Sequence, residues 1–314
     1  MKRILVTGAG GQIGTELTLL LRREFGAENV IASDARDLAE ILEGPREILD
    51  VLDRERLWEI AERYQVDTVF HLAAILSATG EKNPQLCHRV NTEGFFHVLE
   101  LAREKKLDRV ICPSSIAAFS PETGDNPAEV AVLRPKTMYG ITKVWGELMA
   151  EYYWEKFGVD VRGVRYPGII SWRTEPGGGT TDYAVASYYD ALRRGSYECF
   201  VSEDTVLPMM YMPDALKALV DLAKVERSSL RYCTYNVGSL SFSAGEMTEA
   251  IRKILPDFTC TYVPDERQKI ADTWPRKLND SAAREDWNWS PEWDLDAMSR
   301  DMIDNLRKKF GTAE

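Results

Sequence analysis

Three side chains suited to proton transfer follow one another near the middle of the chain: Ser115, Tyr139 and Lys143. Tyr139 and Lys143 stand four positions apart, so on a helix they lie on one face. A neighbouring ammonium favours phenolate over phenol, and a tyrosine tuned in this way can take a proton from an alcohol. A Tyr/Lys pair alone is common on helix surfaces. Ser115, however, follows an apolar strand, and a serine at the carboxyl end of a parallel strand faces the ligand crevice.

A glycine-rich turn near the start of the chain is a second chemical feature. Gly8, Gly11 and Gly14 have GxxGxxG spacing and lie between an apolar run and a helical pattern. Glycine lets the backbone turn sharply and approach a pyrophosphate closely, and a helix N-terminus attracts the negative charge. A plain glycine-rich turn is the alternative interpretation. The position between a strand and a helix favours a dinucleotide site.

Acidic residues follow the next two predicted strands. Asp34 comes about 20 residues after the glycine motif, where a carboxylate accepts hydrogen bonds from the adenosine ribose. Its negative charge repels a 2′-phosphate, so we predict NAD rather than NADP, with Arg36 as an opposing charge nearby. Asp50 and Val51 follow the third strand and are expected to flank the adenine ring.

The elements that must position these residues alternate along the first half of the chain. Apolar runs predict strands at residues 4–6, 29–33, 47–49, 68–72, 109–112 and 161–165, and helical periodicity predicts helices at 13–25, 53–64, 84–105 and 139–157. This alternation predicts a parallel sheet with helices on both faces, which right-handed crossovers make doubly wound. We expect residues 1–166 to form the cofactor-binding domain, to which later segments near 205–240 return. Residues 167–314 are expected to form mainly a smaller substrate-binding lobe.

Composition excludes several classes of protein. The chain has 314 residues, 44% of them hydrophobic, which is enough for a large core. Fifty acidic against 39 basic residues give a net charge of −11, which disfavours a nucleic-acid partner. We see no membrane span and no signal peptide, and expect a cytoplasmic protein. The five cysteines form no CxxC pair and the three histidines are scattered, so no disulfide framework and no metal site are expected.

Together these features resemble the extended short-chain dehydrogenase/reductase superfamily over essentially the full length of the chain. The matching residues are Gly8, Gly11, Gly14, Asp34, Asp50, the stretch 71–74, Asn91, Ser115, Tyr139 and Lys143. Most members act on nucleotide sugars and carry an asparagine after the sixth strand that reaches the substrate diphosphate. This chain has Gly168 there. Residues 76–81, 113–119, 178–184, 207–211 and 271–275 are instead similar to the short-chain family of L-threonine 3-dehydrogenases.

The resemblance implies an α/β fold, a doubly wound parallel Rossmann sheet with a smaller C-terminal substrate-binding lobe, and NAD as cofactor. It implies Ser115, Tyr139 and Lys143 as catalytic residues. For the cofactor it implies Gly8, Gly11, Gln12, Ile13, Gly14, Asp34, Asp50, Val51, Leu72, Ala73, Ala74, Asn91, Tyr139, Lys143, Tyr166, Gly168 and Ile169. For the substrate it implies Ser77, Ser115, Tyr139, Gly179, Thr180, Thr181 and Trp274. Asn91 and His71 are expected to make structural hydrogen bonds.

The implied activity is the NAD-dependent oxidation of the L-threonine β-hydroxyl to 2-amino-3-oxobutyrate. In this interpretation Tyr139 takes the hydroxyl proton, Ser115 hydrogen-bonds the same oxygen, and Lys143 tunes Tyr139 and holds the nicotinamide ribose. Two alternatives remain open: a nucleotide-sugar epimerase or dehydratase, and a non-catalytic NAD-binding regulator. Gly168 argues against the first, and the intact Ser/Tyr/Lys set argues against the second.

Two further expectations concern assembly and motion. In the enzymes that this chain resembles, the helices at 84–105 and 139–157 pack against their copies, so a homodimer that binds a small-molecule substrate is predicted. Gly177, Gly178 and Gly179 form a run without side chains to pack. We expect residues 177–181 to be mobile without ligand and to close over the substrate.

Overall fold

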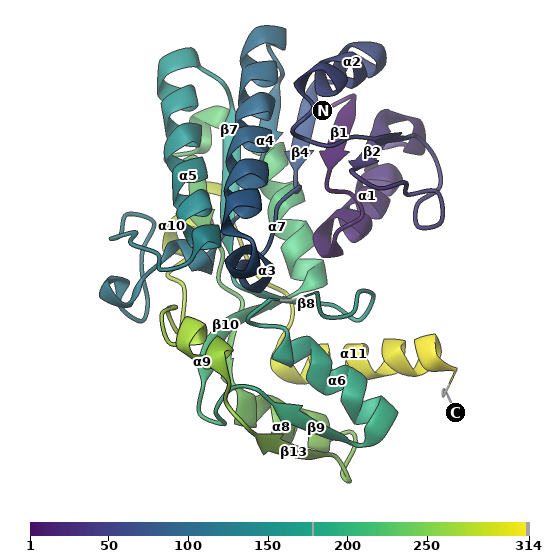
Figure 1. Ribbon diagram of the computed structural model, residues 1–314, viewed down its shortest axis with the longest axis vertical. Helices are drawn as coiled ribbons and strands as arrows, with labels where there is room; N and C mark the ends of the chain where they lie inside the picture. Colours follow the sequence, from purple (N-terminus) through teal and green to yellow (C-terminus); the bar gives the residue numbers. More distant parts are fainter. Residues whose placement is uncertain (178, 312–314) are drawn as a thin grey trace.

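A parallel sheet is the largest feature of the structure, a computed structural model that describes residues 1–177 and 179–311 (Figure 1). Its strand order is β3-β2-β1-β4-β5-β7-β11, with β6 paired to β7. Each ladder in this sheet is parallel. The strands are β1 (Ile4–Thr7), β2 (Val30–Asp34), β3 (Arg46–Ile48), β4 (Thr68–His71), β5 (Arg109–Ile111), β6 (Ser114–Ser115), β7 (Val161–Tyr166) and β11 (Thr234–Asn236).

Helices cover both faces of this sheet, which confirms the doubly wound α/β fold. Alternation along β1 shows the two faces: Ile4 and Val6 pack into one buried cluster and Leu5 into another. The helices around the sheet are α1 (Gln12–Phe25), α2 (Arg54–Tyr64), α3 (Ser77–Lys82), α4 (Pro84–Lys105), α5 (Met138–Phe157), α7 (Met212–Lys224) and α10 (Ser281–Trp287). Helices α1 and α7 share the cluster with Ile4, and α2, α4 and α5 share the cluster with Leu5.

Side-chain caps explain where several helices begin. Asp53 accepts a hydrogen bond from the backbone N–H of Arg56 at 3.0 Å, so α2 starts where the sequence predicts. Thr137 caps α5 in the same way, through the N–H of Gly140 at 3.1 Å. The second strand begins one residue later than predicted, because Asn29 completes a 3₁₀ turn before it.

A second group of elements lies below the large sheet in Figure 1. It contains the sheet β12-β10-β8 and the pair β13-β9. Its elements are β8 (Gly168–Ile170), α6 (Tyr183–Arg194), β9 (Ser196–Cys199), β10 (Val206–Tyr211), β12 (Leu240–Ser243), α8 (Ala244–Arg252), β13 (Thr259–Tyr262), α9 (Glu266–Ala271) and α11 (Leu295–Phe310). Buried residues of these elements form a hydrophobic cluster of their own. A division of function at residue 166 stays a prediction.

The strand order places a ligand crevice at one edge of the large sheet. The chain runs outward from β1 to β2 and β3 on one side, and through β4, β5 and β7 on the other. Open α/β sheets bind ligands outside the carboxyl ends of the strands where the order reverses. Residues 114–118, made of β6 and the 3₁₀ turn η2 (Ile116–Ala118), follow β5 at this edge.

Two sequence expectations concern the loop near residue 178 and the absence of a membrane span. Gly178, which belongs to the predicted mobile loop at 177–181, lies outside the described residues. Within the described ranges, no helix combines the length and the apolar character needed to cross a membrane.

Candidate active site

A wide cleft opens at the carboxyl edge of the large sheet, between the sheet and the second group of elements. It encloses about 1100 Å³, open solvent at its mouth included. The cleft brings together many of the residues predicted from the sequence: Gly8, Gly11, Gln12, Ile13, Gly14, Leu72, Ala74, Ser77, Ser115, Tyr139, Lys143, Tyr166, Gly168, Ile169, Gly179, Thr180, Thr181 and Trp274.

The glycine turn at one end of the cleft has the form of an anion site. Gly8 has a φ of +70°, and a Cβ there would lie 2.5 Å from the backbone nitrogen of Ala73. A Cβ at Gly14 would lie 2.2 Å from the carbonyl oxygen of Gly8. Gly11 caps α1, and among the described residues no side chain caps this helix and no acid stands in its first turn. The residues therefore fit a cofactor pyrophosphate at the helix N-terminus.

Ser115, Tyr139 and Lys143 meet on the lining of the cleft. Ser115 ends β6, and its Oγ accepts a hydrogen bond from the N–H of Ala117 at 3.2 Å. The Lys143 Nζ lies 5.4 Å from the centre of the Tyr139 ring and donates to the carbonyl oxygen of Pro113 at 2.7 Å. The ammonium therefore lies beside the Tyr139 ring and is held there by a backbone carbonyl.

Close packing at Gly140 brings these groups together. A Cβ at position 140 would lie 2.2 Å from the carbonyl oxygen of Ala117 and 2.6 Å from the Cβ of Pro135. Only glycine therefore lets the first turn of α5 approach the turn that follows Ser115. This close contact between α5 and the turn after Ser115 places Tyr139, the residue before Gly140, on the cleft lining.

His71 lies under the cleft as a neutral group. Its Nδ1 is 2.8 Å from the Thr7 hydroxyl, and its ring stacks on Phe95 with 5.5 Å between ring centres. Burial, and then the charge of Lys143, lower the pKa of His71 to about 3. The imidazole is thus uncharged near neutral pH, as a structural role requires.

Another part of the cleft lining carries hydroxyl groups. Thr180 is only 1% exposed, and its hydroxyl has no hydrogen-bond partner among the residues that the structure describes. An orphaned buried hydroxyl on a cleft wall indicates a ligand that completes it. Ser77, buried at the start of α3, lines the same cleft. Trp274 closes one side and packs near Ile116 and Phe119.

Three residues predicted for the adenosine end do not line the cleft. Asp34 ends β2, and its Oδ2 accepts a hydrogen bond from the N–H of Gly10 at 3.0 Å. The Oδ1 of Asp50 accepts from the N–H of Leu52. Val51 is buried against α4, where a Cβ added at Gly94 would meet it at 2.6 Å. Only Asp34 of the three contacts the glycine turn, and the contact of all three with a cofactor stays a prediction.

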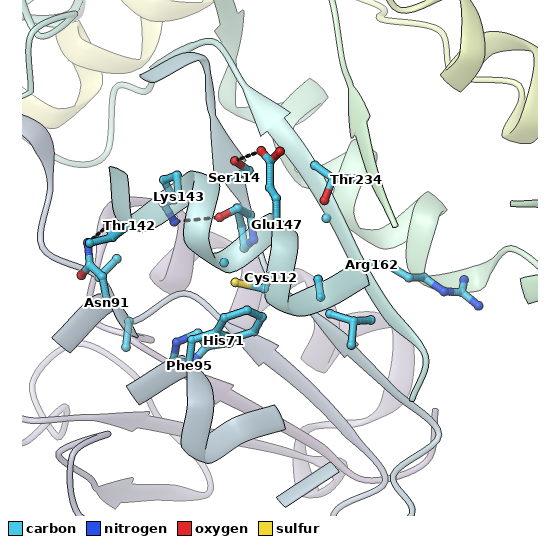
Figure 2. Close-up of a pocket in the computed structure, with 17 residues that line it drawn as sticks. His71, Asn91, Phe95, Cys112, Ser114, Thr142, Lys143, Glu147, Arg162 and Thr234 are labelled. Carbon is cyan, nitrogen blue, oxygen red and sulfur yellow. Dashed lines mark hydrogen bonds between the residues drawn. The ribbon is translucent and has the colours of Figure 1, made fainter. Parts of the chain in front are cut away.

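Ala73 and Asn91 line a smaller cavity behind the cleft, between the sheet and helices α4 and α5 (Figure 2). The side-chain amide of Asn91 accepts from the N–H of Ile75 at 2.8 Å and donates to its carbonyl at 3.1 Å. It also donates to the Thr142 hydroxyl at 3.0 Å. Asn91 thus ties the segment that leads to Ser77 to helix α5, which is the backbone role expected from the sequence.

The cleft also includes residues that the sequence did not assign to it. These are His71, Leu76, Pro113, Ser114, Ile116, Pro167 and Asp182. Asp182 is the one carboxylate among the described lining residues, and it accepts a hydrogen bond from the N–H of Gly179 at 2.8 Å. Several of them lie inside the segments that carry the family resemblance, such as 76–81, 113–119 and 178–184. The resemblance of these segments, rather than any single residue, was the signal that could have placed them in the cleft.

Within the described residues no group of histidines, cysteines and carboxylates could hold a metal ion.

Comparison with known proteins connects this geometry to one family. The model of the NAD dependent epimerase/dehydratase family matches residues 4–238. An uncharacterized epimerase/dehydratase of Staphylococcus saprophyticus is 46% identical, over 98% of each chain. A solved L-threonine dehydrogenase from Phytophthora infestans is 50% identical, with a TM-score of 0.96 over 98% of this chain and 99% of that one. A monomeric L-threonine 3-dehydrogenase from a metagenome is 49% identical, with a TM-score of 0.95 over the same shares.

The neutral state of His71 can be tested by proton NMR. Because burial holds its pKa near 3, the ring C2-proton resonance of His71 should not shift between about pH 5 and pH 8, where histidines ordinarily titrate. The resonance is assigned by its loss in His71→Gln. A titration midpoint near pH 6.5, the ordinary value, would contradict the burial that we describe.

Proposed function

The chain belongs to the NAD dependent epimerase/dehydratase family, and we propose that it is a dehydrogenase that oxidises the β-hydroxyl of L-threonine with NAD. The product of this reaction is 2-amino-3-oxobutyrate. The observation that carries the proposal is the meeting of Ser115, Tyr139 and Lys143 in a cleft that also has an uncapped helix N-terminus. Relatives 50% and 49% identical to this chain are described as L-threonine dehydrogenases, which supports threonine as the substrate.

The side chains of the cleft can perform the proton transfer that this oxidation needs. Tyr139, as phenolate, takes the proton of the substrate hydroxyl, while the Ser115 hydroxyl donates a hydrogen bond to the same oxygen. The Lys143 ammonium stabilises the phenolate and can also hold the nicotinamide ribose. As the carbonyl forms, the hydrogen on the β-carbon leaves with its electron pair. Accepting this hydride is the chemistry that NAD supplies when bound.

The hydroxyl groups of the cleft lining suit a small amino acid. The buried Thr180 hydroxyl needs a partner, and a substrate carboxylate would accept its hydrogen bond. Ser77 offers a second hydroxyl on the lining. Asp182 supplies a negative charge, which favours the substrate ammonium. Together with Trp274 these groups suit a zwitterion rather than a large uncharged alcohol.

The alternative nucleotide-sugar activity is disfavoured by the surroundings of Gly168. A Cβ at position 168 would lie 2.5 Å from the Met209 sulfur and 2.8 Å from the Cβ of Thr181. An asparagine cannot occupy this position unless Met209 and Thr181 move. The space in which the resemblance implies a diphosphate-binding side chain is therefore filled by side chains from β10 and from the loop before α6. A purely regulatory NAD-binding protein has no use for the Ser115, Tyr139 and Lys143 set.

The cytoplasm remains the location that we propose. The five cysteines are present as free thiols, a state that the reducing cytosol maintains.

Replacing Tyr139 by phenylalanine tests the proposed function. The variant keeps the ring but lacks the group that takes the proton, so kcat for L-threonine oxidation should fall by about 10²–10⁴. NAD affinity, measured by calorimetry, should fall far less than kcat because the glycine turn is unchanged. Tyr64→Phe, on α2 away from the cleft, is the matched control. Equal kcat in wild type and Tyr139→Phe would contradict the assignment.

Replacing Asp34 by alanine tests the choice of cofactor. Wild type should prefer NAD over NADP, because a carboxylate near the ribose repels a 2′-phosphate. Asp34→Ala should weaken NAD binding and relax the preference, since Arg36, with its Nε 3.6 Å from Asp34, then faces the cofactor alone. Steady-state kinetics with both cofactors measure the effect. Equal use of both cofactors by wild type would show that Asp34 does not discriminate.

We also propose a homodimer formed through α4 and α5. Their outer faces expose apolar side chains, with Leu148 60% and Tyr152 52% exposed; the others are Leu86, Phe96, Ile141 and Phe157. A contiguous exposed apolar face on paired helices is typical of a protein interface. Sedimentation at micromolar concentration should give a dimer, and Leu148→Glu should give a monomer while Leu19→Glu on α1 does not. A monomeric wild type, as the metagenome relative is described, would refute this proposal.

A further inference from the structure

Helix α5 contacts the segment after β5 at three successive levels. Gly140 touches the carbonyl of Ala117. One turn later, the Lys143 ammonium donates to the carbonyl of Pro113 at 2.7 Å. Another turn later, the carboxylate of Glu147 accepts a hydrogen bond from the Ser114 hydroxyl. Figure 2 shows the hydrogen bond between Ser114 and Glu147, with Lys143 on the same helix.

Glu147 is held from a second strand as well. The guanidinium of Arg165, on β7, donates to both carboxylate oxygens, from Nε at 3.0 Å and from Nη2 at 2.7 Å. The two side chains are 6% and 5% exposed. The Arg165 Nη1 donates to the carbonyl of Glu129 at 2.8 Å and to the Asn236 amide oxygen at 3.2 Å. One carboxylate thus joins α5 to β6 and, through Arg165, to β7, β11 and the loop that precedes α5.

Stability alone does not account for this pair. Taking a carboxylate and a guanidinium out of water is costly, and a buried ion pair can often be replaced by apolar residues without loss. What the pair adds is directional contact, since both carboxylate oxygens have fixed donors. Glu147 lines the smaller cavity and not the large cleft, so it is not expected to touch substrate or cofactor.

We propose that Glu147 and Ser114 are positioning residues that set the distance of Tyr139 and Lys143 from Ser115. The inference rests on the proposed function, which makes that distance important for catalysis. Ser114 is the direct chain neighbour of Ser115, and Glu147 stands one and two turns beyond Lys143 and Tyr139 on the same helix face. When Lys143 turns its ammonium toward a ribose, the Ser114–Glu147 contact still holds the helix to the strand end.

A second buried ion pair, between Arg162 on β7 and Asp160 just before this strand, provides a matched control. Arg162 donates to both oxygens of Asp160, at 2.8 and 2.7 Å, and its Nη1 donates to the carbonyls of Leu222 and Val225. In Figure 2 the guanidinium of Arg162 points away from Glu147 and Ser114. Asp160→Asn therefore breaks a buried pair of the same kind without touching α5 or Ser114.

The test compares Ser114→Ala, Glu147→Gln, their double variant and Asp160→Asn in the full chain. Because misplacement of about 1 Å can cost about 10²-fold in rate, Ser114→Ala and Glu147→Gln should each lower kcat for L-threonine by about fivefold or more. Ser114 lines the cleft, but neither Ser114 nor Glu147 is assigned to threonine or NAD, so the KM for threonine and the Kd for NAD should change less than kcat. Ser114→Ala removes the Ser114–Glu147 contact, and Glu147→Gln places an N–H group against the Arg165 guanidinium. Both changes weaken the same anchoring of α5, so the double variant should lose less than the product of the two single losses. Asp160→Asn should lower the Tm and leave kcat within about twofold.

Hydrogen exchange supplies a readout that does not depend on turnover. Amides of residues 138–147 should exchange faster in Ser114→Ala and Glu147→Gln than in wild type, and not in Asp160→Asn. A kcat within about twofold of wild type in both variants, or a loss no greater than that of Asp160→Asn, would overturn the inference. If Glu147→Gln does not fold, Ser114→Ala decides alone. A wild type inactive on threonine contradicts the proposed function only, and unchanged exchange would then overturn the positioning role.

Discussion

The candidate site depends on how closely helix α5 approaches the chain that follows β5. Ser115 and Tyr139 come from different elements, and nothing in the local sequence joins them. The missing Cβ at Gly140 permits the approach to Ala117, and the ammonium of Lys143 donates a hydrogen bond to the Pro113 carbonyl. A hydroxyl, a phenol and an ammonium on one cleft wall are the result, and their chemistry follows from that closeness.

Helix α1, which follows the glycine turn, makes side-chain contacts with the second group of elements. The side-chain amide of Gln12, at the start of α1, donates to the carbonyl of Ile169 on β8 at 3.5 Å. Glu16, one turn later, accepts a hydrogen bond from the Ser171 hydroxyl, and burial raises the pKa of its carboxyl. Gly168 keeps β8 tight against Met209 and Thr181. The helix that would receive a pyrophosphate is thus in contact with the root of the loop that carries Thr180.

Local chemistry explains what the sequence could predict. Strand and helix periodicity, the glycine spacing and the Tyr139/Lys143 pair are each contained in a short window, and the parallel sheet and the cleft follow from them. The partners of Glu147 could not be predicted, because Arg165 and Ser114 reach it from separate strands and a buried ion pair has no sequence period. Asp182 was missed because a carboxylate beside a glycine loop usually caps a turn, which it also does here for Gly179. Asp34 and Asp50 have backbone partners that spacing alone does not reveal.

The central claim is that this cleft moves a hydride from the β-carbon of L-threonine to NAD. Purified protein is incubated with NAD and L-threonine that carries deuterium on the β-carbon, and the cofactor is analysed by mass spectrometry. A parallel incubation with UDP-galactose is analysed for its 4-epimer. The account predicts one deuterium in the reduced cofactor and no change in the nucleotide sugar. Reduced cofactor without deuterium, or epimerised sugar beside unreacted threonine, would contradict it.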